Sequence, residues 1–412
     1  MDVLNVYLNE RHVGRLSEAD GVLSFVYLPA YVAQGSGEQL SLSLPVRAEP
    51  YAHGEVEPFL SNLLPDDIIR TRIAAILQIP RENTFALLKA LGGDCAGAIA
   101  FFSEGQTPET PSAKFRELTD EEAGRILDNL EHRPLDVGED GFRISGAGAQ
   151  DKLIACFADG RVSLPLQGTP STHIIKNPLH DYPDSVENEF FVMQLAKACG
   201  LRAASCAIRR IGGRLRYVTT RYDRVVENGV VRRLHQEDFC QMMKVVPSHK
   251  YESVGGPGIR DCFALLRAAH LPASDTVEFL DRVIFNFLIG NGDAHGKNFS
   301  VLYHGRQARL APAYDLMSTA IYPEVGKRMA MKIDGEYAFK WITRGKFLRL
   351  AESCGLGAKL VERELNRLSR HMLREAEKWA AICNQEHPSA CYVRIVDGLA
   401  TRVRQIEPSA AI

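Results

Sequence analysis

Short stretches in which apolar and polar residues alternate occupy much of the first hundred residues. A period of two is typical of β-strands with one buried face. Three segments show it: LNVYL (4–8), GVLSFVYL (21–28) and QLSLSLPV (39–46). Residues 57–79 and 82–91 instead repeat their apolar positions at helical spacing. We therefore predict a small α+β unit over residues 1–105.

The composition changes after this unit. Residues 103–115 are rich in polar residues and proline, which favours an exposed linker. Thr119 and Glu122 then have the spacing of a capping box at the start of a helix. Residues 106–140 are thus predicted to form a linker followed by a helix.

From residue 141 the period of two returns. The segments expected to form strands are FRIS (142–145), KLIACF (152–157), VSLP (162–165) and THIIK (172–176). The D-G pair at 159–160 predicts a hairpin turn between two of them. A helix over 184–200 and a hairpin over 206–220 follow. The prediction is an α+β chain with a strand-rich unit at 141–222 and a mainly helical one at 223–412.

Composition and charge narrow the class of protein only slightly. The chain has 412 residues, and this length predicts two or three packed units. Its net charge of −2 offers no general attraction to nucleic acid or to an anionic membrane. Nine cysteines, none spaced as C-x-x-C, favour reduced thiols over disulfides or a zinc site. No apolar run suggests a signal peptide or a membrane span. We expect a cytoplasmic protein without a membrane partner.

A polar loop, NGDAHGKNFS (291–300), follows an apolar helix that is predicted to stop at Asn291-Gly292. Asp293 and Asn298 lie five residues apart on this loop. The next segment predicts a hairpin that turns at His304-Gly305 and returns Asp315 to the loop. An aspartate that orients a hydroxyl group, with an asparagine and a second aspartate that bind Mg²⁺, is what phosphoryl transfer requires.

Upstream features complete the same arrangement. The small residues of SGAGAQDK (145–152) would let backbone N–H groups approach phosphates, and Lys176 ends a strand where it would reach them. Glu187 or Glu189, on the next helix, would pair with this lysine. The order of loop, lysine, acidic helix, hinge, catalytic loop and metal aspartate is that of a protein kinase. Residues 141–222 would be its small lobe and residues 223–412 its large lobe.

Each upstream feature also has an ordinary structural explanation. SGAGA fits a hairpin loop, Lys176 fits a solvated lysine at the end of a strand, and His295 fits a capping or packing residue. Asp223 and Arg224 are expected to form a structural ion pair. The acidic and amide groups of the 291–315 region are less easily explained in this way.

Several strings resemble one family more closely than the general kinase pattern. They are FRISGAGAQDK, THIIKNP, SVENEF, LHQEDFCQ, KYESVGGPGI, LIGNGDAHGKNFS and PAYDLMS. They resemble the HipA serine/threonine kinases, the toxins of bacterial toxin–antitoxin pairs, and EPFLSNLLPDD is similar to the first subdomain of that family. The resemblance covers nearly the whole chain. It implies a protein-kinase-like two-lobe fold with an extra β-rich N-terminal subdomain.

The resemblance implies roles for matching positions. Asp293 would be the catalytic aspartate, and Asn298 and Asp315 would bind Mg²⁺. Ser145 would be an autophosphorylation site, whose phosphate would repel the phosphates of ATP and silence the enzyme. The residues implied in ATP binding are Ala147, Gly148, Ala149, Gln150, Asp151, Lys152, Lys176, Thr220, Arg221, Tyr222, Gln236, His295, Lys297 and Tyr314.

The resemblance also implies a target and partners. The protein substrate of the family is glutamyl-tRNA synthetase, whose phosphorylation halts translation. The family's partner is HipB, a helix-turn-helix antitoxin that bridges the kinase to operator DNA. In this chain the helix predicted over 358–380 has a basic row that would touch DNA phosphates, formed by Arg363, Arg367, Arg370 and Arg374. The interleaved glutamates favour a solvated face instead.

Two other functions stay open. The D-x-H-x-x-N loop at 293–298 also resembles loops of phosphoinositide kinases, so a small-molecule or lipid kinase is one alternative. The lack of a membrane-directed basic or amphipathic segment near the site counts against lipid. A catalytically silent corepressor, which would bind only an antitoxin and DNA, is the other alternative, and the intact set of Asp293, Asn298 and Asp315 argues against it.

Overall fold

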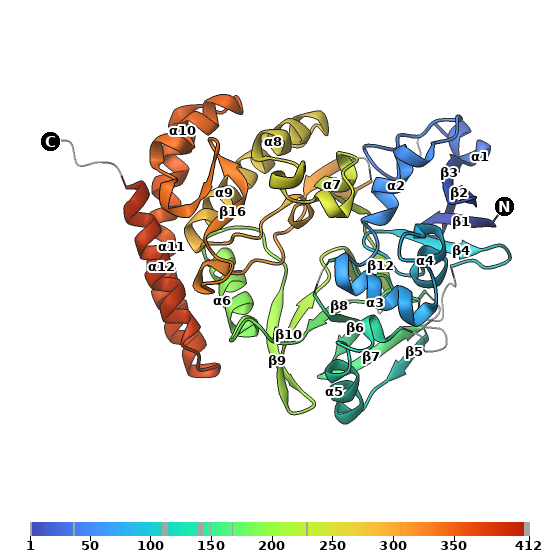
Figure 1. Ribbon diagram of the computed structural model, residues 1–412, viewed down its shortest axis with the longest axis horizontal. Coiled ribbons are helices and arrows are strands. Elements are labelled where there is room, and N and C mark those ends of the chain that lie inside the picture. Colours follow the sequence, from blue (N-terminus) through green and yellow to red (C-terminus); the bar gives the residue numbers. More distant parts are fainter. Residues whose placement is uncertain are drawn as a thin grey trace. The chain divides into compact units, whose positions relative to one another are not determined.

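The structure is a computed structural model, and its residues fall into two compact units (Figure 1). It describes residues 2–35, 38–108, 114–137, 143–148, 150–166, 168–227, 230–305 and 307–407, without the side chain of Asp67. The first unit comprises Met1–Asn177, Arg209–Ser248 and Val301–Ala308. The second comprises Pro178–Ile208, His249–Ser300 and Arg309–Ile412. The chain therefore passes between the units several times.

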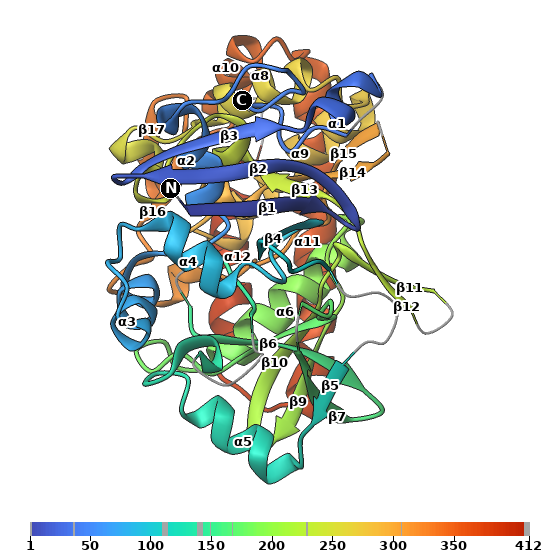
Figure 2. The same ribbon diagram turned by 90° about the vertical axis from the view of Figure 1, so that its right-hand side faces the viewer.

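The first unit begins with a four-stranded antiparallel sheet, whose strands lie side by side in Figure 2. In spatial order the strands are β3 (Val22–Tyr27), β2 (Arg11–Ala19), β1 (Asp2–Leu8) and β4 (Ile99–Ser103). The helices of this region are α1 (Pro29–Ala33), α2 (His53–Ser61), α3 (Asp67–Leu77) and α4 (Thr84–Leu91). Alternation along β1 buries Leu4, Val6 and Leu8, as predicted.

The prediction of a strand at residues 39–46 is wrong. Ser41 and Leu44 form only an isolated bridge around a tight turn. Alternate positions still differ in environment, because Leu44 is buried in the core whereas the Ser41 and Ser43 hydroxyl groups bond to buried polar groups of residues 237–241. The alternating pattern thus arises here from a turn whose apolar side chain enters the core and whose serines bond to buried polar groups, and not from a strand.

A second sheet of six strands follows in the first unit and contains the hairpin predicted around the D-G turn at 159–160; THIIK pairs with KLIACF and not with VSLP, so these three strands form no meander. Its order is β5 (Lys114–Glu117), β7 (Arg161–Leu166), β6 (Lys152–Ala158), β8 (His173–Lys176), β10 (Arg214–Thr220) and β9 (Cys206–Ile211). The capping box of Thr119 and Glu122 is confirmed at the start of α5 (Asp120–Asp128). The middle of the predicted linker, residues 109–113, lies outside the described residues.

The predicted strand FRIS is wrong for the part that is described. Ile144 makes only an isolated bridge with Asp94, and the backbone N–H of Ser145 donates to the Asp94 carbonyl (3.2 Å). This segment therefore pairs with the N-terminal region of the chain and not with β6.

Shorter elements complete the first unit. They are β11 (Arg224–Glu227), β12 (Val230–Arg233), β13 (Gln236–Asp238), α7 (Phe239–Met242), β14 (Ser300–His304) and β15 (Gln307–Leu310). β11 pairs with β12, and the third sheet has the order β13-β14-β15. The hairpin predicted to turn at His304-Gly305 is confirmed by β14 and β15.

The second unit is mainly helical. Its helices are α6 (Ser185–Ala198), α8 (Ile259–Ala268), α9 (Ala273–Ile289), α10 (Arg344–Ser353), α11 (Ala358–Glu386) and α12 (Cys391–Ile406). A small hairpin, β16 (Arg328–Ile333) and β17 (Glu336–Ala338), accompanies them. α11 packs against α6, α9, α10 and α12, and Figure 1 shows α11 beside α12. The predicted α+β class is confirmed.

Two further findings concern the cysteines and the helices. All nine cysteines are free thiols. Within the described ranges, no helix combines the length and the apolar character needed to cross a membrane.

Candidate active site

The loop that carries the predicted catalytic residues begins at a left-handed glycine. α9 ends at Ile289, and Gly290 adopts a φ of +75°, so the helix stops one residue earlier than the predicted Asn291-Gly292 turn. Asp293 is exposed, while residues 294–300 are buried. Its backbone N–H donates to Oδ1 of Asn291 (3.0 Å). The loop therefore exposes the carboxylate of Asp293, while the residues that follow it are buried.

The second unit brings Asn298 and Asp315 together, as the hairpin prediction required. Nδ2 of Asn298 donates to Oδ2 of Asp315 (3.2 Å), and Asp315 is exposed. Asp315 has a left-handed backbone (φ +57°), a conformation that aspartate tolerates better than most residues and that is concentrated at functional sites. Carboxylate and amide oxygens are ligands that Mg²⁺ prefers, so the two side chains are of the right kind for a magnesium ion. In this structure Nδ2 of Asn298 faces Asp315, and Oδ1 of Asn298 accepts from the N–H of His295 (3.2 Å).

The chain after Asp315 is hydrogen-bonded to the start of the loop that carries Asp293, the predicted catalytic aspartate. The Ser318 hydroxyl donates to the carbonyl of Ile289 (2.6 Å), and the N–H of Ala320 donates to the carbonyl of Gly290 (2.9 Å). The N–H of Gly292 donates to the Thr319 hydroxyl (2.7 Å). These bonds satisfy carbonyls at the end of α9 and fix the segment after Asp315, the predicted metal ligand, against the loop.

Three other predicted ATP-binding residues lie in the same region. His295 and Lys297 are buried within the loop. The Tyr314 hydroxyl donates to the carbonyl of Lys297 (2.7 Å) and lies 2.6 Å from the Ser300 hydroxyl. Tyr314 thus connects the returning chain to the catalytic loop one residue before Asp315.

The sequence interpretation missed Tyr251. Its hydroxyl donates to Oδ1 of Asp293, and its ring meets the ring of His295 edge to face, with the centroids 4.8 Å apart. Tyr251 belongs to the string KYESVGGPGI, which resembles the family but contains no catalytic pattern of its own. Tyr251 and Asp293 are 42 positions apart in the sequence, so no local spacing predicts their contact.

In the first unit, the predicted phosphate loop packs against the N-terminal region. Ser145 is buried, and its hydroxyl donates to the carbonyl of Leu63. The N–H of Asp66 donates to the carbonyl of Gly148 (3.2 Å), and Arg72 forms an ion pair with Asp151 (3.0 Å). The predicted residue Ala149 lies outside the described residues.

Two lysines lie opposite each other beside this loop. Lys152 on β6 faces Lys176 on β8 in the antiparallel register. Nζ of Lys152 donates to the carbonyls of Ala147 (3.1 Å) and Gln150 (2.7 Å), which closes the loop. Nζ of Lys176 lies 5.5 Å from the centre of the Tyr217 ring. Lys176 belongs to the first unit and Glu187 and Glu189 to the second, so their pairing stays a prediction.

The predicted hinge, Thr220 to Tyr222, continues from β10. The Tyr222 hydroxyl donates to Oε1 of Gln236, so two predicted ATP-binding residues touch each other. Oγ1 of Thr220 lies 3.4 Å from Nε2 of His173. The Arg221 side chain points into a buried cluster of charges, so a nucleotide contact at this position would use the backbone.

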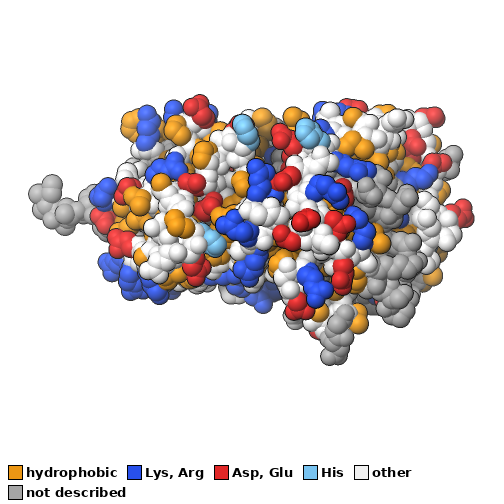
Figure 3. All heavy atoms as spheres, turned by 90° about the horizontal axis from the view of Figure 1, so that it is seen from below, with side chains coloured by type: hydrophobic (Ala, Val, Ile, Leu, Met, Phe, Trp, Pro, Cys, Tyr) orange, Lys and Arg blue, Asp and Glu red, His pale blue; other side chains and the backbone are white. Residues whose placement is uncertain are grey.

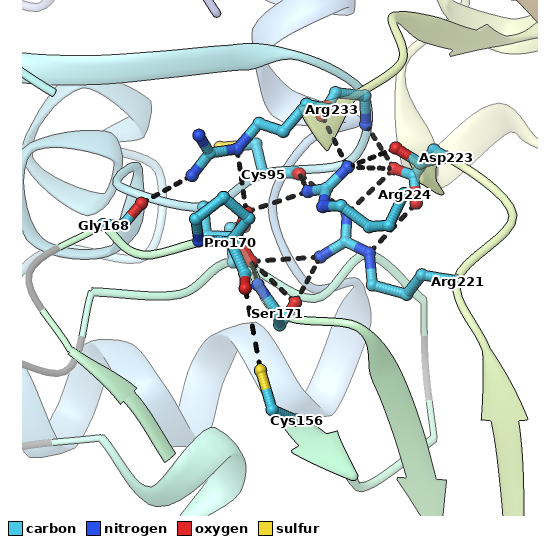
Figure 4. Close-up of polar contacts among 12 residues, drawn as sticks. Cys95, Cys156, Gly168, Pro170, Ser171, Arg221, Asp223, Arg224 and Arg233 are labelled. Carbon is cyan, nitrogen blue, oxygen red and sulfur yellow. Dashed lines mark hydrogen bonds and ion pairs between the residues drawn. The ribbon is translucent and has the colours of Figure 1, made fainter. Parts of the chain in front are cut away.

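This cluster joins the N-terminal region to the hinge (Figure 4). The Asp94 carboxylate forms ion pairs with Arg224 (2.8 Å), Arg221 (3.2 Å) and Arg233 (3.2 Å). Burial alone would raise the pKa of Asp94, but the three arginines outweigh that effect and hold the pKa well below its ordinary value. The predicted pair of Asp223 and Arg224 is confirmed within the same cluster (2.9 Å).

The basic row on α11 is largely engaged in ion pairs. Arg367 pairs with Glu364 and Asp281, Arg363 pairs with Glu364, and Arg374 pairs with Glu375 (3.3 Å). Basic and acidic side chains are also interspersed over the face drawn in Figure 3. These ion pairs agree with the alternative reading of a solvated helix face.

The order of elements is that of the protein-kinase class, and comparisons with known proteins assign the family. Residues 4–102 match the family model of the HipA N-terminal domain, and residues 144–380 match that of the HipA-like C-terminal domain. The chain belongs to the HipA family of serine/threonine kinase toxins, as its sequence motifs predicted.

Individual relatives agree with this assignment. The chain is 43% identical to the protein Y4mE of Sinorhizobium fredii over 373 residues, which cover 89% of each chain. It is 31% identical to the serine/threonine-protein kinase toxin HipA of Shewanella oneidensis, over 90% of this chain and 87% of that one. A solved complex of HipA, HipB and operator DNA from Shewanella oneidensis MR-1 matches with a TM-score of 0.83 and 27% identity, over 98% of this chain and 97% of the matched one.

Proposed function

We propose that the chain is an ATP- and Mg²⁺-dependent serine/threonine protein kinase that inhibits translation as a toxin. The observation that carries this proposal is the contact of Asp315 with Asn298, on the loop that also carries the exposed carboxylate of Asp293. Few other chemistries need an amide, two carboxylates and a buried lysine in the chain order of a kinase.

In the proposed reaction Asp293 accepts a hydrogen bond from a serine or threonine hydroxyl of the protein substrate. The hydroxyl oxygen forms a bond to the γ-phosphorus of ATP while the bond from that phosphorus to the bridging β–γ oxygen breaks. ADP leaves, and the hydroxyl proton passes to Asp293. Mg²⁺, held by Asn298 and Asp315, would neutralise charge on the phosphates.

The other residues proposed for nucleotide binding come from both units. Lys176 and the loop of residues 147–152 would contact phosphates, and Thr220 to Tyr222 with Gln236 would contact the adenine side. Support comes from Lys152 and Lys176, two buried lysines that lie opposite each other on neighbouring strands beside this loop. In the second unit, His295, Lys297 and Tyr314 are also proposed to bind ATP.

Autophosphorylation at Ser145 would silence the enzyme. The Ser145 hydroxyl is buried and donates to the Leu63 carbonyl, so a phosphate at this position could not keep that contact. A group with nearly two negative charges would expel the segment from its packing and change the adjacent phosphate loop.

The proposed target is glutamyl-tRNA synthetase, and the proposed partner is a HipB-like helix-turn-helix antitoxin that brings the kinase to operator DNA. The matched Shewanella complex, which contains HipA, HipB and operator DNA, supports the antitoxin and the DNA. The nine free thiols are consistent with a cytoplasmic location.

The test is transfer of labelled γ-phosphate from ATP to serine or threonine, in the chain itself and in purified glutamyl-tRNA synthetase. Asp293→Asn and Asp315→Asn should each lower the rate at least about 100-fold, and chelation of Mg²⁺ should stop it. Asp181→Asn, at an exposed aspartate, is the control. Full activity of Asp315→Asn would refute the kinase site, whereas an unlabelled synthetase with a labelled chain would refute only the target.

A further inference from the structure

The segment Lys250–Ile259 has no role in the site proposed above, yet it reaches the catalytic carboxylate. Tyr251 precedes the 3₁₀ turn Glu252–Val254, and its hydroxyl donates to Oδ1 of Asp293. Asp293 is exposed, so its carboxylate lacks the dense packing that fixes a buried side chain. A hydrogen bond from a rigid neighbour is one way to hold it in one orientation.

Backbone contacts on both sides hold Tyr251 in place. The carbonyl of Lys250 accepts from the N–H of Gly296 in the catalytic loop (3.3 Å), and the carbonyl of Tyr251 accepts from Val254 (3.1 Å) and Gly256 (2.9 Å). A Cβ at Gly256 would lie only 2.1 Å from the carbonyl oxygen of His249, so this close turn requires glycine.

The rest of the segment is anchored as well. Oε2 of Glu252 accepts from the N–H of Lys332 on β16 (2.6 Å). The planes of the Tyr251 and His295 rings make an angle of 88°, and this edge-to-face contact limits how the tyrosine side chain can rotate. The tyrosine hydroxyl is therefore presented to Asp293 by a turn that is fixed to the catalytic loop at one end and to β16 at the other.

We propose that Tyr251 is a positioning residue for phosphoryl transfer. Its hydroxyl holds the carboxylate of Asp293 through Oδ1, in the orientation in which Oδ2 receives the hydroxyl group of the protein substrate. The inference rests on the proposed function, because it takes Asp293 to be the catalytic aspartate. Tyr251 acts on the acceptor side only, so its hydroxyl contributes to the chemical step and not to nucleotide binding.

Tyr251→Phe tests this role because it removes the hydroxyl and keeps the ring beside His295. The first two readouts come from transfer of labelled phosphate to the chain itself: the first-order rate constant at saturating ATP, called kcat here, and the ATP concentration that gives half of this rate, called KM here. The affinity for ATP and the melting temperature are measured as well. We expect kcat to fall between about 10- and 100-fold, the range for the loss of a hydrogen bond to a charged group. KM and the affinity for ATP should stay within about twofold, since no nucleotide contact changes.

A matched control is Tyr337→Phe. Tyr337 lies on β17, where its ring packs beneath Arg328 and Lys332, and this contact needs no hydroxyl. The control should match the wild-type protein in every readout.

The outcomes separate the two levels of the proposal. If Asp293→Asn is inactive and Tyr251→Phe has the kcat of the wild-type protein, the role of Tyr251 is refuted and the kinase site stands. If Tyr251→Phe raises KM as much as it lowers kcat, or loses activity only together with its melting temperature, Tyr251 is a structural residue. If Asp293→Asn transfers phosphate like the wild-type protein, or the wild-type chain transfers none, the proposed function fails first.

Discussion

The side-chain amide of Asn188, on α6, forms two hydrogen bonds with the backbone of Ser318, three residues after Asp315. Nδ2 donates to the Ser318 carbonyl (3.0 Å), and Oδ1 accepts from the Ser318 N–H (2.9 Å). Both residues are fully buried. Asn188 thus links α6 to the segment that follows the proposed metal ligand Asp315. The Ser318 hydroxyl in turn bonds to the carbonyl of Ile289, which links the same segment to the end of α9.

Asn188→Ala should therefore lower both stability and activity. It leaves a buried N–H and a buried carbonyl without partners, which costs about 1–3 kcal/mol of the free energy of unfolding for each group. Urea denaturation measures this loss, and the rate of phosphate transfer should fall with it. Gln194→Ala is the control on the same helix, since that side chain is half-buried and bonds weakly to the carbonyl of Cys206 (3.4 Å). Equal stability of the two variants would contradict the prediction.

Asp94 should be the most sensitive charged position of the first unit. Asp94→Asn keeps the shape of the side chain but leaves three arginines around a neutral amide, and it turns an N–H donor toward Arg221 or toward the N–H of Ser171. Breaking such a buried pairing costs about 3–5 kcal/mol. Because Arg221 belongs to the proposed hinge, KM for ATP should rise as well.

The control for this variant is Asp2→Asn. Asp2 pairs with Lys89 at 3.4 Å on the surface, where an ion pair contributes at most about 1 kcal/mol. Urea denaturation of both variants gives the comparison. A loss for Asp94→Asn no larger than that for Asp2→Asn would show that the cluster is not important for stability.

The sequence was informative wherever the relevant residues lie close together along the chain. Asp293 and Asn298 share one loop, and one short hairpin leads from it to Asp315, so local patterns were enough to predict that Asn298 meets Asp315. Asp94 meets Arg221 across 127 residues, and no local pattern carries that pairing. Tyr251 was missed for the same reason, because its partner lies in a distant loop and its own neighbours give no chemical signal.

Errors in the predicted elements have a related physical cause. The alternation in residues 39–46 reflects two kinds of buried neighbour around a turn, which a strand would also produce. The end of α9 was placed at Asn291-Gly292, the stronger turn dipeptide, although Gly290 takes the left-handed conformation. The position at which α9 ends depends on hydrogen bonds from Ser318 and Ala320 to the carbonyls of Ile289 and Gly290, and the sequence alone does not reveal these contacts.

Glu237 should make the stability of the protein depend on pH near neutrality. It is fully buried and accepts hydrogen bonds from the Ser41 hydroxyl, the Leu42 N–H (2.9 Å) and the Tyr303 hydroxyl. Burial raises its pKa from 4.5 to about 7, although these donors oppose the rise. The folded protein thus binds this proton more tightly than the unfolded chain does. The contribution to stability is complete below pH 4.5 and is lost as the pH rises to about 7.

Glu237→Gln removes this titration. The free energy of unfolding of the wild-type protein and of the variant is measured between pH 4.5 and 8. The wild-type protein should lose stability relative to the variant as the pH rises, by at most about 3 kcal/mol across this range. Any fixed cost of placing an amide near these donors shifts the whole curve and leaves the slope unchanged. Parallel curves would show that Glu237 ionises in the folded protein as it does in the unfolded chain.

Gly290 should be essential for the placement of the catalytic loop. Its φ of +75° disfavours a side chain, and an added Cβ would lie 2.6 Å from Cβ of Ala320 and 2.8 Å from Cζ of Arg402. Nε of Arg402 donates to the carbonyl of Leu288 (2.8 Å), so a shifted guanidinium would also release a carbonyl at the end of α9. Gly290→Ala should lower the melting temperature and kcat together.

Gly355→Ala separates backbone strain from crowding in this experiment. Gly355 has a similar φ of +69°, and an added Cβ there would meet no atom within 4 Å. Its substitution should cost only the strain of the left-handed conformation, about 1–2 kcal/mol, and leave phosphate transfer unchanged. The extra loss in Gly290→Ala then measures the crowding against Ala320 and Arg402. If both variants lose the same stability and neither loses activity, the contacts around Gly290 do not position the loop that carries Asp293.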